Sequence, residues 1–223
     1  MIADQASWWQ RLGSFSLGSS GLRGTGGNGS SVRVSLVNNA VITTRGMRST
    51  GILAQSIGAG GGTTDWEHFT DFTSRLGASN ASRGRGGVVR VSLSQSQINT
   101  FGDQSFGILA QSIGGGGGNA SFDMSTLAGA AGYISNLNVE LGGSGTSSGD
   151  SGAVDLSLVG SEVTTEGYGA VGIVAQSIGG GGGSASIYYG NGVGSGSPTY
   201  LLGGDSGQPY GDGNSVSVSL SKD

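Results

Sequence analysis

The sequence predicts an all-β protein, a β-solenoid with glycine-rich turns and variable loop excursions. Two observations lead to this prediction: near-identical blocks recur along the chain, and these blocks alternate aliphatic and polar residues as half-buried strands do. Units of this kind cannot bury an apolar face alone, whereas stacking them makes a continuous core. A β-sandwich and a propeller are the competing architectures, but neither requires such literal copying of whole blocks.

The amino-acid composition excludes several other classes of protein. The 223 residues include 49 Gly but only 2 Pro and no Cys, and 11% are charged while 35% are hydrophobic. The glycines have no three-residue period, which excludes collagen, and there are too many spaced aliphatic residues for a disordered linker. A net charge of −4 gives no electrostatic footprint for nucleic acid. No apolar run is long enough to span a membrane as a helix, and the start of the chain is not expected to be a signal peptide.

Each unit begins with a strand in which aliphatic residues alternate with Arg, Asp or Ser. The block reads VRVSL at 32–36 and 89–93, VDLSL at 154–158 and VSVSL at 216–220. Strict alternation predicts that one face of each strand is buried. The side chains expected to share this core are Val34, Leu36, Val91, Leu93, Leu156, Leu158, Val218 and Leu220.

A second, shorter strand is expected five positions after the last Leu of each block. β-Branched residues alternate there, which favours a strand. The pairs are Val41 with Thr43, Ile98 with Thr100, and Val163 with Thr165.

The most literal repeat comes next, followed each time by a run of small residues, mainly glycine. It reads GILAQSI at 51–57 and 107–113 and GIVAQSI at 172–178, a spacing of roughly 60 residues. If the units stack, equivalent side chains form ladders, as identical residues do in stacked strands. The expected ladders are aliphatic at Ile52, Ile108 and Ile173 and amide at Gln55, Gln111 and Gln176.

The excursions are where the units differ. Residues 63–76 place aromatic residues at near-helical spacing, so a short helix is expected there, and residues 6–12 look similar. A strand leading into a Leu-Gly step ends each excursion, most clearly before Leu141. The candidate ligand-facing residues, whose preferred role is to cover the edge of the stack, are Trp66, His68, Tyr188 and Tyr189.

The chain is interpreted as one solenoid segment, residues 1–223. Its units are approximately 31–87, 88–152 and 153–214, with partial units at 1–30 and 215–223.

At the GILAQSI blocks and their glycine runs, the chain resembles the passenger regions of large autotransporters. These are surface proteins that Gram-negative bacteria export through their own C-terminal outer-membrane barrel. The resemblance covers the chain from about Gly18 to Asp223. It implies a right-handed parallel β-helix at the cell surface, tethered through a barrel outside this sequence, with a role in adhesion, aggregation or biofilm formation. It brings no catalytic residues, because such passengers are mostly not enzymes.

The residues themselves offer little for catalysis or metal binding. His68 is the single histidine and lies far in sequence from any nucleophile motif. Asp150, Asp205 and Asp212 lie in glycine-rich stretches like the calcium turns of some β-helices, but the nonapeptide period is missing. They are therefore expected to be turn formers. The sequence predicts no enzyme and no cofactor, with calcium as the alternative.

Two classes of function remain open. The preferred one is a non-catalytic structural or adhesive module of the cell surface. Its partners are host or bacterial surfaces, glycans among them, and it self-associates through exposed strand edges. The alternative is a carbohydrate-binding or carbohydrate-active extracellular β-helix with a groove lined by Trp66, Tyr188 and Tyr189. Neither class involves nucleic acid or membrane contact by this segment.

Overall fold

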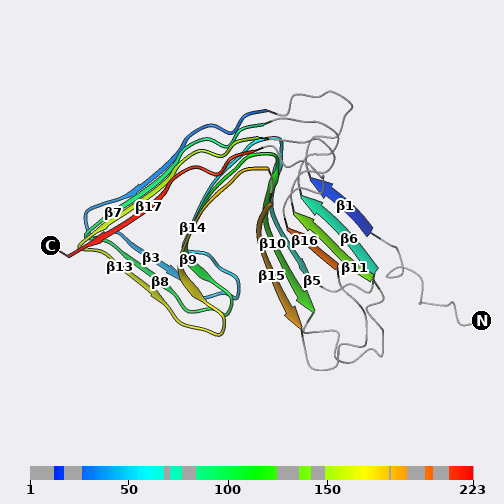
Figure 1. Ribbon diagram of the computed structural model, residues 1–223. Helices are drawn as coiled ribbons and strands as arrows, with labels where there is room; N and C mark the ends of the chain where they lie inside the picture. The colour runs from blue at the N-terminus through cyan, green and yellow to red at the C-terminus, as the bar shows by residue number, and fades with distance from the viewer. Residues whose placement is uncertain are drawn as a thin grey trace, which may run out of the picture.

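The structure, a computed structural model, describes residues 13–17, 27–67, 71–76, 84–124, 136–141, 149–180, 182–189, 199–202 and 211–222. Side-chain environments are described within 27–60, 84–116, 149–180 and 211–222. Across these residues every regular element is a β-strand, and no helix there is long and apolar enough to cross a membrane. The strands form five parallel sheets, which are seen along the stack in Figure 1. The all-β class is confirmed.

Three of the sheets form from the blocks in which alternation predicts strands. The first sheet contains β2 (Val32–Leu36), β7 (Val89–Ser94), β12 (Val154–Val159) and β17 (Val216–Ser221). The second sheet contains β3 (Val41–Thr44), β8 (Gln97–Thr100) and β13 (Glu162–Thr165). The third sheet contains β4 (Ile52–Ile57), β9 (Phe106–Ile113) and β14 (Val171–Ile178). These three sheets surround one apolar interior.

Two further sheets complete each repeat. The fourth forms where the sequence predicts variable excursions, whereas the strands of the fifth end at Leu17, Leu76, Leu141 and Leu202, where the Leu-Gly steps predict strands. The fourth sheet contains β5 (Gly61–Glu67), β10 (Gly117–Met124) and β15 (Gly182–Tyr189). The fifth sheet contains β1 (Gly13–Leu17), β6 (Asp71–Leu76), β11 (Asn136–Leu141) and β16 (Thr199–Leu202). The fourth and fifth sheets lie side by side on the right of Figure 1, on the side away from the first and second sheets.

The helix expected within residues 63–76 is wrong. This stretch contains strands β5 and β6 instead. Strand β5 pairs with β10, and β6 pairs with both β1 and β11, so their backbone groups are satisfied by strands of other repeats. Such long-range pairing overrides a local spacing of aromatic residues. Residues 6–12, where the same element was expected, lie outside the described residues.

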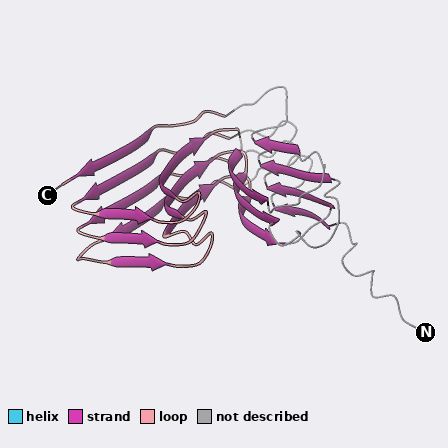
Figure 2. Ribbon diagram, turned by 90° about the horizontal axis from the view of Figure 1, so that it is seen from below, coloured by secondary structure: helices cyan, strands magenta, loops and turns pink. Residues whose placement is uncertain are grey.

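Every strand pairs with its equivalent in the next repeat, and Figure 2 shows the resulting rows of parallel strands. The register keeps equivalent residues together, so that Ile52 aligns with Ile108 and Ile108 aligns with Ile173. The expected aliphatic ladder is confirmed. The repeats nevertheless differ in length, because the glutamines of this sheet are separated first by 56 and then by 65 residues. The segments between strands absorb that difference.

The amide ladder of the third sheet is also confirmed. The Nε2 of Gln55 donates to the Oε1 of Gln111 over 2.6 Å, and the Nε2 of Gln111 donates to the Oε1 of Gln176 over 2.6 Å. Gln111 is completely buried, so its amide depends on these neighbours for hydrogen bonds.

A row of serines, Ser56, Ser112 and Ser177, ties the third sheet to the chain that leads into the first; we call it the serine seam. The Oγ of Ser112 donates to the carbonyl of Gly87, just before β7 at the same level of the stack (2.8 Å), and accepts from the N–H of Gly152, just before β12 at the next level (2.7 Å). Ser56 and Ser177 make the equivalent pair of bonds. A hydroxyl suits this role because it donates and accepts at once. The seam leaves no room for a side chain at Gly86, where a Cβ would lie 2.5 Å from the Ser112 Oγ.

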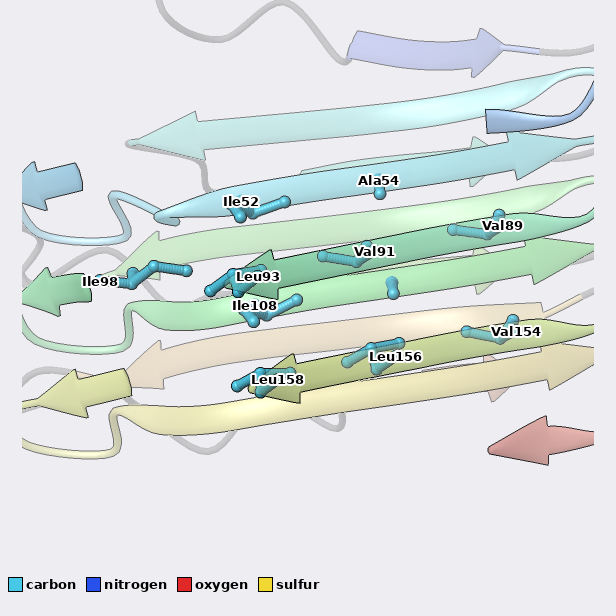
Figure 3. Packing of buried hydrophobic residues seen from close by; sticks show 11 residues of the cluster. Ile52, Ala54, Val89, Val91, Leu93, Ile98, Ile108, Val154, Leu156 and Leu158 are labelled. Carbon is cyan, nitrogen blue, oxygen red and sulfur yellow. The ribbon is translucent and has the colours of Figure 1, made fainter. Parts of the chain in front are cut away.

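The apolar core lies between the first three sheets (Figure 3). Val89, Val91 and Leu93 of β7 are between 0% and 2% exposed, and they lie among Ile98 of the second sheet and Ile108 of the third. The other buried members of this cluster are Ile52, Ala54, Ala110, Val154, Leu156 and Leu158. Val34 and Leu36, on the outermost strand of the first sheet, are partly buried against it. The predicted core is thus confirmed for strands β2, β7 and β12.

For the last strand the core prediction is wrong. Val218 is 46% and Leu220 is 66% exposed, although they align with Leu156 and Leu158. The reason is geometric. Strand β17 pairs with β12, but the second and third sheets stop one repeat earlier, at β13 and β14. In the described part of the chain, no strand of those sheets covers the inner face of β17.

In the second sheet, the predicted alignment of strand β3 is wrong by one residue. Ile42, not Val41, is the partner of Ile98, and Thr44, not Thr43, is the partner of Thr100. Val41 is therefore exposed and Ile42 packs against the core. A shift of one residue moves every side chain to the opposite face of a strand. Here the first turn is one residue longer than its equivalents.

Candidate functional site

A groove crosses three repeats at the turns between the first and second sheets. It has a volume of about 460 Å³ and is lined by Asn39 and Val41, then by Gln95 and Gln97, then by Gly160, Ser161 and Glu162. These three sets belong to successive repeats, so the groove runs along the stacking direction. We call it the turn groove.

The floor of the turn groove is a row of residues in the left-handed backbone region. The φ angles are 58° at Asn39, 47° at Gln95 and 53° at Gly160. Glycine adopts this region freely and asparagine often does, whereas for other residues it costs roughly 1–2 kcal/mol. Gln95 therefore occupies a strained position that glycine fills in the next repeat.

Backbone hydrogen bonds between repeats hold this floor in place. The N–H of Gln95 donates to the carbonyl of Val159 (2.9 Å), and the N–H of Gln97 donates to the carbonyl of Ala40 (2.9 Å). The N–H of Glu162 donates to the carbonyl of Ser96 (3.0 Å). The backbone that carries the lining side chains is thus held by hydrogen bonds to the neighbouring repeats.

The polar groups of the groove are mainly side-chain amides. Asn39, Gln95, Gln97 and Glu162 are all exposed. No hydrogen bond joins the amide of Asn39 or of Gln97 to another residue that the structure describes. The carboxylate of Glu162 accepts a bond from the Oγ1 of Thr164 (3.3 Å). The groove therefore presents donors and acceptors to solvent, one carboxylate, and the exposed apolar side chain of Val41.

The aromatic residues singled out by the sequence lie elsewhere. Trp66 is on β5 and aligns through β10 with Ile187, whereas Tyr188 and Tyr189 follow Ile187 on β15. Their backbones thus belong to one sheet, but their side chains are not among those described. His68 lies outside the described residues. The ligand-facing role proposed for these four residues stays a prediction.

The acidic residues considered for calcium make protein contacts. The carboxylate of Asp150 forms an ion pair with the Nε of Arg85 (3.4 Å) and accepts a bond from the N–H of Asp212 (3.2 Å). Asp205 lies outside the described residues. Among the residues that the structure describes, no three His, Cys, Asp or Glu side chains come together as a metal site would require.

Charged and aromatic side chains also meet on the outer surface of the stack. Arg90 pairs with Asp155 of the next repeat across the first sheet (3.2 Å), and both are partly exposed. At the end of the second sheet, the guanidinium of Arg45 lies 5.1 Å from the ring centre of Phe101. Exposed pairs of this kind contribute little stability, roughly 0–1 kcal/mol each.

A second cavity, of about 360 Å³, opens where the core ends beside β17. It is lined by Leu158, Val163, Ile173 and Leu220 together with Ser161, Ser221 and Lys222. It is the end of the apolar interior, left uncovered where the second and third sheets stop.

The residues of the turn groove were not recognised from the sequence, where they read as ordinary polar turn residues. One signal was present: Gln95 stands in a turn where the other repeats place Asn and Gly. Only the positive φ angles turn that difference into an observation about strain. Comparison of this chain with protein-family models, with curated proteins and with solved structures finds no match.

Proposed function

We propose that this chain is a non-catalytic structural and adhesive module of a bacterial cell surface. In this proposal the stacked sheets form a right-handed parallel β-helix, held at the outer membrane through a barrel encoded outside this sequence. The module extends away from the cell and displays the variable segments between its strands.

The observation that carries the proposal is the in-register pairing of each strand with its equivalent one repeat away. A stack built this way lengthens by about 4.8 Å for every repeat added, at the same hydrogen-bond pattern. It is an efficient way to span distance with a regular chain. The resemblance of the GILAQSI blocks to autotransporter passengers supports the cellular setting.

The outward-facing residues support an extracellular role for the surface. On the first sheet one outward row is Ser35, Ser92, Ser157 and Ser219, and a second is Arg33, Arg90, Asp155 and Ser217. The hydroxyls offer many weak polar contacts over a long surface, and Arg90 and Asp155 form an ion pair with each other. Adhesion of the kind that sums many weak contacts suits a surface of this composition.

Surface labelling tests the proposal directly. Antibodies raised against the 223-residue chain should label intact cells of the bacterium that produces it. Deleting the gene should reduce cell settling or biofilm mass, and purified chain should release no reducing ends from polysaccharides. Labelling that requires permeabilised cells, or depolymerisation of a polysaccharide, would overturn the proposal.

A further inference from the structure

We propose that the turn groove binds a linear, uncharged oligosaccharide that lies along the stacking direction. This inference gives the adhesive role proposed above a ligand class and a location. It concerns residues other than the aromatic ones that the sequence singled out.

The shape of the groove fits an extended chain rather than a compact ligand. Its lining comes from three successive repeats, each contributing at the same turn. Neighbouring strands are about 4.8 Å apart, so equivalent side chains recur at that interval. A pyranose ring in an extended oligosaccharide has a similar length. Successive sugars would therefore meet equivalent positions of successive repeats.

The hydrogen-bonding groups match hydroxyls. A sugar hydroxyl both donates and accepts, and a side-chain amide offers two donors and an acceptor. Asn39 and Gln97 present such amides without a hydrogen bond to another described residue. Val41, which is 59% exposed and is the strand partner of Gln97, offers an apolar contact to the face of a sugar ring.

The charge of the lining selects against acidic sugars. No Lys or Arg is among the residues that line the groove, and its one charged side chain is Glu162. A uronic acid or sialic acid would approach this carboxylate without a compensating cation. The uncharged class is therefore the one that the groove accommodates.

The experiment is a glycan array probed with the intact 223-residue chain. The array carries uncharged gluco-, galacto- and manno-oligosaccharides of increasing length, with sialylated and uronic-acid oligosaccharides beside them. We expect binding to uncharged linear oligosaccharides that strengthens with length up to the span of the groove. Affinity for the best one is then measured by calorimetric titration.

Two groove variants and one control decide the location. Gln97→Ala and Asn39→Gly should each weaken binding about tenfold, the effect of losing a well-placed hydrogen bond. Asn39→Gly should do so while the denaturation midpoint stays close to that of the unmodified chain, because glycine adopts the φ of 58° at this position freely. Asn99→Ala removes an amide on the same strand outside the groove and should leave the affinity unchanged.

Several outcomes would overturn this inference. They are an array without uncharged binders, binding confined to acidic sugars, and binding that survives both groove variants. A change of sedimentation on Gln97→Ala in place of a change of glycan affinity would assign the groove to contacts between copies instead. Surface labelling of cells is unaffected by any of these results, so a failure here leaves the display function standing.

Discussion

Gln111 illustrates how a single polar residue is accommodated in the middle of the stack. It is fully buried, yet both ends of its amide are satisfied by the glutamines above and below it. The arrangement tolerates a polar side chain in the interior only because the same residue recurs in register. A buried amide without such partners would cost about 1–3 kcal/mol for each group left unsatisfied.

We therefore expect Gln111→Met, which keeps the volume and removes both bonds, to lower the free energy of unfolding by about 2–4 kcal/mol. Gln176→Met removes one ladder bond at the outer strand and should cost less than half as much. Urea denaturation monitored by circular dichroism measures both. Equal losses for the two variants would contradict the ladder as the cause.

Leu93 and Leu220 occupy equivalent positions of the first sheet but differ in environment. Leu93 is 2% exposed and Leu220 is 66% exposed. Leu93→Ala should cost about 2–5 kcal/mol, because it leaves a cavity in a packed interior. Leu220→Ala should change stability by less than about 0.5 kcal/mol. The midpoints of chemical denaturation decide, and an unchanged midpoint for Leu93→Ala would exclude the described core.

Within a sheet, neighbouring strands lie so close together that some positions have no room for a Cβ and must be glycine. Gly107 and Gly172 occupy equivalent positions beside β9 residue Ile108 and β14 residue Ile173. A Cβ on Gly107 would lie 2.5 Å from the carbonyl oxygen of Gly172 and would collide with the side chain of Val163. A Cβ on Gly172 would meet nothing within 4 Å. Glycine is therefore required at position 107, inside the stack, and replaceable at the equivalent position 172, at its edge.

This difference gives a matched pair of variants. Gly107→Ala should destabilise the protein by about 1–3 kcal/mol, the usual cost of overpacking. Gly172→Ala should be neutral or slightly stabilising, since alanine restricts the unfolded chain. Thermal denaturation of the two variants beside the unmodified chain measures the effect. If Gly172→Ala proved the more damaging, the order of strands in the third sheet would have to be different.

Some strands could be predicted from the sequence and others could not. Literal repetition of VRVSL and GILAQSI predicted the strands of the first and third sheets and the ladders at Ile108 and Gln111, because alternation and identity are local properties of the chain. The strand of residues 61–67 was missed, since its partners are supplied by other repeats and leave no local pattern. The strand that ends at Leu76 was predicted by its Leu-Gly step, although a helix was expected over the same residues. The register of Ile42 was missed because a single extra turn residue is invisible without the pairing. The turn groove was missed for the same reason: it exists only between repeats.

At the scale of the whole molecule, the five sheets do not end at the same level. The first and fifth sheets contain four strands, whereas the other three contain three. The outer face of the last level therefore combines the exposed inner residues of β17 with the open edges of β13 and β14. If a second copy docked end to end on the first and fifth sheets, the second, third and fourth sheets would each have a gap of one strand at the junction.

We expect the 223-residue chain to self-associate weakly at this end through unpaired strand edges. Sedimentation velocity at increasing concentration should show a sedimentation coefficient that rises without reaching a defined dimer. Leu220→Lys places a charge on the exposed face and should suppress the rise, whereas Ser35→Lys at the opposite end of the first sheet should have a smaller effect. A strict monomer up to millimolar concentration would contradict the expectation.

The serine seam has a consequence for how such a protein changes over evolutionary time. Each seam serine donates at its own level of the stack and accepts from the next level, so the junction between any two neighbouring repeats carries the same hydrogen bonds. Duplication or loss of one whole repeat in frame recreates that junction with no compensating substitution. Insertions between strands change a repeat's length while the junction stays constant, as the spacings of 56 and 65 residues already show. The number of repeats can thus change by recombination, while the seam serine itself is retained in every repeat.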